Sequence, residues 1–411
     1  MRRVVLIGCS EVTARLPEAL AGHSLELVAL GTEASPFRRS RFIDRFVSLA
    51  GPLSLEGWIA ALLAEDCPMD GAADWIVHSN DALPHALATA ELPARRRLAL
   101  LPLRRPEGLA MVASKAGLAQ LLQRHGIPTP VTRLVETPDQ LAATLAGCEG
   151  PLMLKADHGS GGQQVRWHAD AAALLAAPPP LAWYPLLVQA WVAGEDCSVE
   201  ALFGDGELLG LQASQPLRSR DRFGPSLSRR FLPSAPAGVT SSLQALGRAA
   251  GLHGFFNCSF RLPAEGSAPL LFEADPRPNA WHAFGPSLGL EWGGLMAAAT
   301  PPARPLQPRN LPGEGRPIHL FPRAPEHALR TLSWTVASPW ILARPGTWDL
   351  RLRQDAAIEA WEWQTLHRAL GSRVLAHPLG RLVWRLLRPF RLSSLRAPRC
   401  WPRAAPRAGG R

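Results

Sequence analysis

The stretch PLMLKADHGSGGQQV, residues 151–165, decides the fold. Its first part, PLMLKA, is apolar and predicts a β-strand that carries one lysine, Lys155. A lysine on an apolar strand is unfavourable unless an anionic group lies nearby. The strand leads into a glycine-rich turn whose small residues let the backbone approach a polyanion and direct N–H groups at it: Gly159, Ser160, Gly161 and Gly162. Such a turn alone is more often a plain hairpin, so its neighbours decide between the two interpretations.

Lysine is almost absent from the chain. Of the 44 Lys and Arg residues, only Lys115 and Lys155 are lysines. Arginine is larger, planar and forked, and it does not replace a compact ammonium group in a tight phosphate site. We infer that both positions require lysine, since chance survival at two such positions is the poorer explanation. Ser114 predicts the N-cap of a helix through LAQLLQRHG, with Gly126 closing its C-terminal end.

A second motif is LLFEADPRPN, residues 270–279. Glu273 and Asp275 are two residues apart on a predicted strand, so both side chains point to one face. Neighbouring carboxylates repel each other unless a divalent cation lies between them, and Mg²⁺ with phosphate oxygens is the usual solution. Arg277 adds a forked donor suited to phosphate or an acyl-phosphate. The alternative is a solvated strand end.

A third motif is QAWVAGEDCSVE, residues 189–200. Glu195, Asp196 and Glu200 follow an apolar strand predicted over 186–192. Their carboxylates could accept hydrogen bonds from ribose hydroxyls, although a charge cluster of this kind is more often a solvated turn.

The rest of the chain predicts strands and helices around these motifs. In the first hundred residues, the strands are 4–8, 25–31 and 75–80, and a helix is predicted over 55–67. This βαβ pattern predicts a parallel sheet covered by helices. The turn GCSEVT lacks GxGxxG spacing, so it predicts no dinucleotide site. Two antiparallel pairs follow, one formed by strands 198–204 and 207–213 and the other by strands 257–263 and 268–276.

In order and spacing, these motifs resemble the ATP-grasp superfamily, in particular its carbamoyl-phosphate-synthetase-like and biotin-carboxylase-like members. The resemblance covers roughly residues 1–300. It implies a chain of mixed α/β and α+β class with these parts: an N-terminal Rossmann-like pre-ATP-grasp domain (1–105), a two-lobed ATP-grasp domain (106–305, with lobes 106–185 and 186–305), a C-terminal extension packed on the core (306–370) and a basic tail (371–411).

The resemblance also implies roles for individual residues. Lys115 is the first basic contact to ATP, while Lys155 and the loop 159–162 hold its phosphates. The hinge that holds adenine comprises Gln189, Ala190, Trp191 and Val192, and Glu195 or Asp196 binds ribose. Glu273 and Asp275 bind Mg²⁺ (or Mn²⁺). Lys155 and Arg277 are the catalytic groups, with Arg277 facing the transferring phosphate.

Three positions depart from the pattern of the superfamily. Asp275 replaces an Asn, which keeps or strengthens cation binding. Ser259 stands where the preceding strand usually offers Glu, Asp or Gln, which leaves one metal ligand unassigned, and Asn257 is a possible substitute. Ser114 stands where an Asp often precedes the basic residue, an exchange between two helix-capping residues.

The activity implied is an ATP-dependent ligation of two small molecules. A carboxylate becomes an acyl-phosphate, and an amine or similar nucleophile displaces the phosphate. Two alternatives stay open: an ATP-grasp phosphotransferase, and a non-catalytic ATP-binding protein with a membrane-surface tail. Candidate substrate contacts are Asn279, His282, Arg218 and Arg220. The two arginines belong to a polar stretch with Arg222, Arg229 and Arg230 that could equally be a solvated basic loop, and His282 could equally be structural.

The net charge of +10 is confined to the C-terminal tail. Residues 371–411 contain ten arginines and no Asp or Glu, so the body is neutral and does not predict nucleic-acid binding. In the tail, PLGRLVWRLLRPFRL is compatible with weak contact to an anionic membrane surface, or with a helix docked on the protein and a disordered end. The absence of an 18-residue apolar run and the six scattered cysteines predict a cytoplasmic protein, peripheral at most to the inner membrane surface. The oligomeric state is left open.

Overall fold

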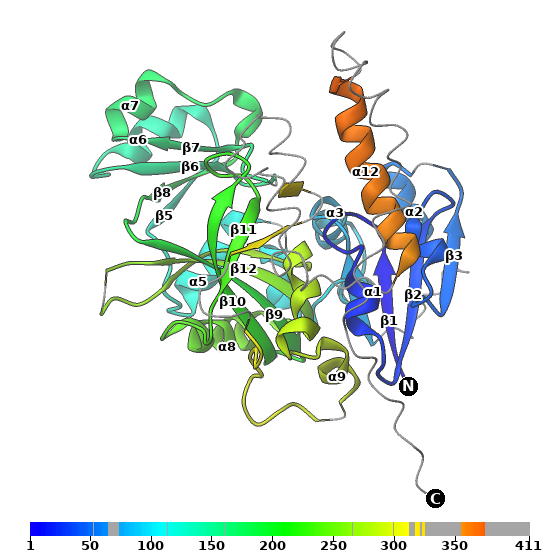
Figure 1. Cartoon of the computed structure of the whole chain (residues 1–411). Helices are drawn as coiled ribbons and strands as arrows, with labels where there is room; N and C mark the ends of the chain where they lie inside the picture. Colours follow the sequence, from blue (N-terminus) through cyan, green and yellow to red (C-terminus); the bar gives the residue numbers. More distant parts are fainter. Residues whose placement is uncertain are drawn as a thin grey trace, which may run out of the picture.

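The computed structural model describes residues 1–51, 53–64, 74–112, 114–159, 161–264, 266–298, 300–311, 317–320, 323–324 and 355–374. Within these residues the strands form three sheets. One is parallel and lies at the N-terminal end of the chain, and the other two are antiparallel (Figure 1).

The parallel sheet has the strand order β3-β2-β1-β4. Its strands are β1 (Arg2–Ile7), β2 (Leu25–Thr32), β3 (Arg45–Leu49) and β4 (Trp75–His78). Its helices are α1 (Leu16–Leu20), α2 (Leu55–Leu63), α3 (Ala82–Thr89) and α4 (Ala94–Ala99), with a 3₁₀ turn η1 (Pro36–Arg39). The parallel pairing is as predicted. The sequence missed β3, because none of the residues of this edge strand is fully buried and it lacks a buried apolar run.

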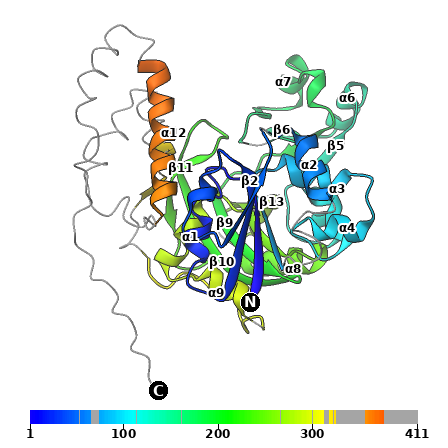
Figure 2. The same ribbon diagram turned by 90° about the vertical axis from the view of Figure 1, so that its right-hand side faces the viewer.

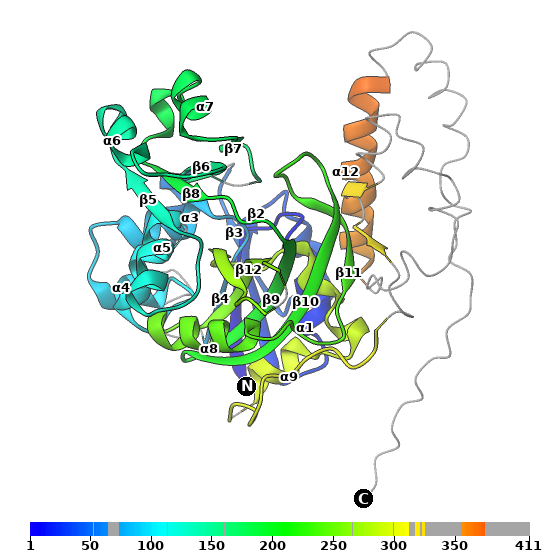
Figure 3. The same ribbon diagram turned by 90° about the vertical axis from the view of Figure 1, so that its left-hand side faces the viewer.

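The smaller antiparallel sheet has the strand order β5-β8-β6-β7 and forms a separate layer (Figures 1 and 3). It comprises β5 (Thr132–Val135), β6 (Leu152–Ala156), β7 (Val165–His168) and β8 (Leu186–Ala190). Short helices cover its apolar side: α6 (Leu141–Leu145) and α7 (Ala171–Ala176), with 3₁₀ turns η3 (Pro138–Gln140) and η4 (Leu181–Trp183). The glycine-rich turn joins β6 to β7.

The larger antiparallel sheet has the strand order β13-β12-β9-β10-β11-β14. Its strands are β9 (Glu195–Gly204), β10 (Glu207–Ser219), β11 (Ser226–Phe231), β12 (Gly254–Leu262), β13 (Leu270–Asp275) and β14 (Ile318–His319). Both predicted antiparallel pairs are present, β9 with β10 and β12 with β13. The hairpin turn between β9 and β10 places Asp205 and Gly206 at positive φ, as a tight turn requires.

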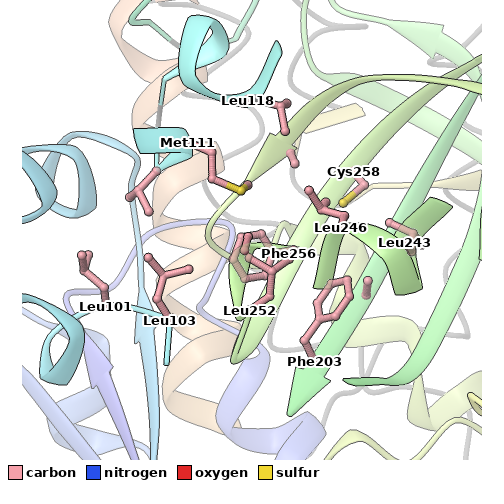
Figure 4. Close-up of a cluster of buried hydrophobic side chains, with 14 of the residues drawn as sticks. Leu101, Leu103, Met111, Leu118, Phe203, Leu243, Leu246, Leu252, Phe256 and Cys258 are labelled. Carbon is pink, nitrogen blue, oxygen red and sulfur yellow. The ribbon is translucent and has the colours of Figure 1, made fainter. Parts of the chain in front are cut away.

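Two helices hold the sheets together. They are α5 (Lys115–Arg124), which follows the 3₁₀ turn η2 (Pro106–Met111), and α8 (Val239–Ala250). Ser114 caps α5 as predicted, since its Oγ accepts from the amide of Gly117 at 3.0 Å. Gly126 adopts a left-handed conformation just after the helix. Leucines of both helices pack with Phe203, Phe256 and Cys258 of the large sheet (Figure 4). This core also includes one face of the parallel sheet, so the apolar packing fixes the two sheets relative to each other.

The last helices cover the other face of the parallel sheet. After η5 (Ala280–Phe284) and η6 (Pro286–Leu288) comes α9 (Trp292–Ala297), and α12 (Ala356–Val374) lies beside α1 (Figure 2). Glu362 of α12 accepts hydrogen bonds of 3.1 and 2.6 Å from buried Arg15. Helix α12 spans the boundary at residue 370 between the predicted extension and the predicted tail, while residues 325–354 and the tail from residue 375 lie outside the described residues.

In the described part of the chain, none of the helices combines the length and the apolar character needed to span a bilayer.

Candidate active site

Lys155 lies near the end of β6, and its ammonium group is buried between the two antiparallel sheets. Its Nζ donates to Oε1 of Gln189 at 2.8 Å and lies 4.7 Å from the ring centre of Phe272 on β13. The side-chain Nε2 of Gln189 in turn donates to Thr132 Oγ1 at 2.8 Å. Burial lowers the pKa of Lys155 to about 8, although the negative charge of Glu273 opposes this shift. An ammonium group held this way is unstable without an anion, so the site favours an anionic ligand.

Lys115 is the first residue of α5 and contacts the start of the glycine-rich loop. Its Nζ donates to the carbonyl oxygens of Asp157 and Gly159, at 3.2 and 3.1 Å. The carboxylate of Asp157 accepts from Ser114 Oγ and from the amide of Ala116. The helix N-terminus therefore anchors the start of the loop, and Lys155 lies on the strand that leads into the loop, within charge range of Lys115.

The glycine-rich loop leans on the turn between β10 and β11. A Cβ atom on Gly162 would lie 2.0 Å from the carbonyl oxygen of Phe223, so only glycine fits this contact. Next to it, the guanidinium of Arg222 lies 5.1 Å from the ring centre of Trp167 on β7. Ser160 lies outside the described residues. The loop glycines all have positive φ: 130° at Gly159, 65° at Gly161 and 73° at Gly162.

The expected adenine hinge lies at the end of β8: Gln189, Ala190, Trp191 and Val192. Gln189 is engaged by Lys155, whereas the Trp191 ring lies 4.6 Å from the guanidinium of Arg261 on β12. Arg261 also contacts Asp196 at 3.2 Å. Burial raises the pKa of the Asp196 carboxyl, while the charges of Arg261 and Lys155 oppose the shift. Both Glu195 and Asp196 are exposed, and Glu195 accepts from Gln215 at 2.9 Å. Asp196 differs in lying beside Arg261 and within charge range of Lys155.

The paired carboxylates of β13 lie on one face of the large sheet. Glu273 is opposite Ser259 and Asp275 is opposite Asn257 across the β12–β13 ladder. The side-chain contacts are long, at 3.5 Å from Ser259 Oγ to Glu273 and 3.3 Å from Asn257 Nδ2 to Asp275. Burial, with repulsion from Glu273 and Asp81, raises the pKa of Asp275 to about 7, although Arg277 opposes it. This face carries more negative charge than its partners neutralise.

The carboxylate oxygens of Glu273 and Asp275 fit Mg²⁺ only if phosphate oxygens supply further ligands. No group of three or more His, Cys, Asp or Glu side chains able to hold a metal ion occurs in the residues that the structure describes. Glu273 and Asp275 supply two carboxylates, and Mg²⁺ is usually held by one or two carboxylates together with substrate phosphates and water. The pair therefore suits a nucleotide-bound cation rather than a structural metal ion.

Arg277 is held from two sides. Its Nε and Nη2 donate to the two carboxylate oxygens of Asp81, at 2.5 and 2.7 Å, and Nη2 also donates to Asp275 at 3.2 Å. Asp81 follows β4, so a residue at the C-terminal end of the parallel strands contacts the arginine beside the carboxylate pair. The fork of Arg277, expected to face phosphate, is occupied by a protein carboxylate.

Asn279 and His282 form a capping box at η5. The backbone N–H of Asn279 donates to His282 Nδ1 at 3.0 Å, and the side-chain Nδ2 of Asn279 donates to Asn257 Oδ1 at 2.7 Å. His282 is buried between Phe255 and Trp292, and this burial lowers its pKa to about 3. The burial of His282 favours a structural role over substrate contact. Asn279 hydrogen-bonds to Asn257, which in turn donates to Asp275, so Asn279 is linked to the carboxylate pair.

The basic stretch after residue 217 is not the loop that the sequence suggested, because residues 226–231 form β11. Arg229 on this strand is buried, and its Nη1 donates to Oε1 of the fully buried Glu200 at 2.7 Å. A buried arginine is tolerated here because Glu200 neutralises it across the sheet. Arg220 remains exposed and contacts Asp221 at 3.2 Å, while Arg218 lies on β10 opposite Ser228.

Four features of the site were not predicted from the sequence: the contacts of Asp81, Arg261 and Phe272, and the ion pair between Arg229 and Glu200. Asp81 carried a usable signal, since it follows a buried parallel strand and such carboxyl edges commonly line ligand sites. The partners of the others come from strands far away in sequence, and no local pattern predicts them.

No family model and no curated protein matches the sequence. Several solved structures share its fold. The L-amino acid ligase from Bacillus licheniformis is 18% identical, with 77% of this chain and 78% of that chain covered and a TM-score of 0.53. The N5-carboxyaminoimidazole ribonucleotide synthetase from Thermus thermophilus is 17% identical, with coverages of 74% and 81% and a TM-score of 0.55.

A third similar structure is the biotin carboxylase domain of 2-oxoglutarate carboxylase from Hydrogenobacter thermophilus, in complex with MgADP, ADP and bicarbonate. It is 17% identical, with coverages of 74% and 71% and a TM-score of 0.55. All three are ATP-grasp enzymes, and the chain therefore has the ATP-grasp fold that its motifs predicted.

Proposed function

We propose that the chain is an ATP-dependent ligase that activates a small-molecule carboxylate as an acyl-phosphate for attack by an amine or similar nucleophile. One observation carries this proposal. Lys115 donates to the glycine-rich loop, Lys155 lies on the strand that leads into this loop within charge range of Lys115, and the negative charge of Glu273 reaches Lys155 from the opposing sheet. Ammonium groups, loop amides and a carboxylate pair are the components that hold a nucleotide triphosphate with its cation.

The nucleotide would lie between the two antiparallel sheets. Trp191 and its neighbours after β8 would contact adenine, and Asp196 would accept from ribose. Lys115, Lys155 and the loop 159–162 would hold the phosphates. In domain terms, we propose a Rossmann-like pre-ATP-grasp domain at 1–105, ATP-grasp lobes at 106–185 and 186–305, and a C-terminal extension that includes α12.

Glu273 and Asp275 would hold Mg²⁺ through the nucleotide phosphates, with Asn257 beside them. When bound, this cation supplies charge neutralisation at the phosphate oxygens. The pKa of Asp275, raised to about 7 by burial and by its acidic neighbours, supports the assignment because a cation would relieve the same repulsion.

The chain's own residues would act by positioning and by electrostatics. A carboxylate oxygen attacks the γ-phosphorus and ADP leaves. The nucleophile then attacks the acyl carbon and phosphate leaves. Lys155 stabilises charge on the transferring group, and the loop resting on the β10–β11 turn limits access of water that would hydrolyse the intermediate. The names of the similar enzymes, an amino acid ligase and a carboxylase crystallised with bicarbonate, support a carboxylate as the activated group.

The test is ADP release by the purified chain with MgATP and a panel of carboxylates and amines, followed by product mass. Ligation gives a joined product and free phosphate, whereas a phosphotransferase gives a phosphorylated product. We expect Glu273→Gln to reduce ADP release at least about a hundredfold, since a charge-stabilising group is lost. Glu207→Gln is the matched control, because Glu207 is half exposed and pairs with Arg248 at 3.8 Å, away from the site. ADP release that is unchanged in Glu273→Gln would contradict the site.

A further inference from the structure

Arg277 has almost no hydrogen-bonding capacity left for a ligand. A guanidinium group has five N–H donors. Two of them go to Asp81, one to Asp275 and one from Nη1 to the carbonyl oxygen of Pro278, at 3.3 Å. One N–H on Nη1 is left without a partner among the residues that the structure describes. The residue therefore cannot grip an oxyanion with its fork, the geometry in which arginine usually binds carboxylate or phosphate.

Asp81 is itself fixed by the edge of the parallel sheet. The preceding residues are tied down, since Ser10 Oγ donates to the carbonyl of Ser79 at 2.8 Å and Asn80 Oδ1 accepts from the amide of Leu83 at 2.9 Å. The side chains of Arg277 and Asp81 are only 13% and 20% exposed. A two-point ion pair with so little exposure is held firmly, and the two residues are 196 positions apart in sequence.

Asp275 is the second carboxylate on the same guanidinium. If Asp81 were absent, Arg277 would be free to turn its fork toward Asp275, which it already touches at 3.2 Å. That rotation would move the remaining N–H and occupy both oxygens of a residue that we assign to the cation. Asp81 thus keeps Arg277 from closing on Asp275.

We propose that Asp81 is a positioning residue for phosphoryl transfer: it holds the fork of Arg277 so that the guanidinium meets the transferring phosphate through a single N–H and leaves Asp275 open to the cation. This inference rests on the proposed function. Through Asp81, the N-terminal sheet takes part in building the phosphate site rather than only supporting it.

The experiment uses inorganic phosphate as the probe, titrated by calorimetry into the full chain saturated with MgADP. We expect Asp81→Asn and Asp81→Ala to weaken phosphate binding by roughly tenfold, the loss of one charge-assisted hydrogen bond. Affinity for ADP measured without Mg²⁺ should stay near its wild-type value, whereas MgADP should bind more weakly because Arg277 then closes on Asp275. The melting temperature should fall in both variants, since Arg277 loses a largely buried partner, so binding is measured well below it. A merely structural role would change the ADP affinity as well. If the alanine variant does not fold, the nearly isosteric asparagine variant carries the test.

Asp205→Asn is the matched control, since Asp205 is 79% exposed and contacts Arg104 at 3.2 Å, far along the chain from the site. In an Arg277→Ala background, Asp81→Asn should have no further effect on phosphate, because Asp81 acts through Arg277. Unchanged or tighter phosphate binding in Asp81→Asn overturns the inference and leaves the proposed function intact. A wild-type chain that binds no MgADP overturns both.

Discussion

At the scale of single residues, Lys155 connects the sequence pattern to the chemistry. Its strand is apolar, Lys155 is 8% exposed, and among the described residues its Nζ donates to one amide oxygen and lies over one aromatic ring. Neither contact neutralises the charge, and burial lowers its pKa to about 8. An anionic ligand would stabilise the protonated form, so binding and protonation are linked.

This linkage predicts a pH dependence of nucleotide binding. Below pH 8 Lys155 is protonated and attracts the phosphates. As the pH rises through 8 the free protein loses this proton, and MgADP affinity should fall roughly fivefold between pH 7 and 9. In Lys155→Met the affinity should be lower throughout and flat over this range. Calorimetry at several pH values measures both. Equal slopes in the two proteins would contradict the role of Lys155.

At the scale of elements, the site depends on loops and strand ends that long-range contacts hold. Gly162 lies against the β10–β11 turn, and the strands β12 and β13 align Asn257 and Ser259 with the carboxylate pair. These arrangements come from the sheet pairings, which bring together segments with no common local pattern.

Substitution of Gly162 tests the contact between loop and turn. Gly162→Ala would place a methyl group 2.0 Å from the Phe223 carbonyl oxygen, whereas Gly147 has the same kind of positive φ but nothing within 4 Å. Both alanine variants should lose about 1 kcal/mol of stability from the left-handed backbone. Only Gly162→Ala should also weaken MgADP binding, by roughly tenfold. Equal MgADP affinities in the two variants would rule out the loop contact as part of the site.

The motifs predicted the elements that carry their own signal. Lys155, Glu273 and the cap at Ser114 lie in short stretches whose pattern determines strand, turn or helix start. Arg229 was placed in a loop because charged residues rarely occupy a buried strand, and the carboxylate that neutralises it, Glu200, lies two strands away on β9. The fork of Arg277 was expected to be open, because nothing near residue 277 indicates a partner at residue 81.

At the scale of the whole molecule, the last described helix packs against the N-terminal part of the chain. Helix α12 contacts η1, Ile358 and Trp361 join the apolar cluster on one face of the parallel sheet, and Arg15 lies between Glu18 and Glu362. A buried charge pair contributes little net stability, but removal of one partner leaves the other uncompensated. Residues more than three hundred positions apart therefore stabilise the N-terminal sheet together.

Glu362→Ala should lower the free energy of unfolding by about 3 kcal/mol, because Arg15 loses its two-point partner while buried. Gln364→Ala lies on an exposed part of the same helix and should change stability by less than about 0.5 kcal/mol. Urea unfolding of both variants measures the difference. Because alanine favours the helix at least as well as glutamine, a loss as large in Gln364→Ala would mean that the ion pair does not determine the result.

Buried histidines predict the acid limit of the fold. Burial lowers the pKa of His78 to about 4 and of His282 to about 3. Between pH 6.5 and these values the unfolded chain binds more protons, so stability falls as the pH falls, by about 1.4 kcal/mol per pH unit for each histidine. His282→Gln should remove one histidine's share of the slope, and His125→Gln, at an exposed position, should not. Unfolding at pH 7, 6 and 5 tests this, and an unchanged slope in His282→Gln would contradict it.

The central claim is that the γ-phosphate of ATP is transferred to a carboxylate. Its most direct test uses the carboxylate that supports ADP release, labelled with ¹⁸O on both oxygens, and mass spectrometry of the phosphate formed. An acyl-phosphate route predicts one ¹⁸O atom in each released phosphate, because the attacking carboxylate oxygen leaves with it. Released phosphate without label would contradict the account.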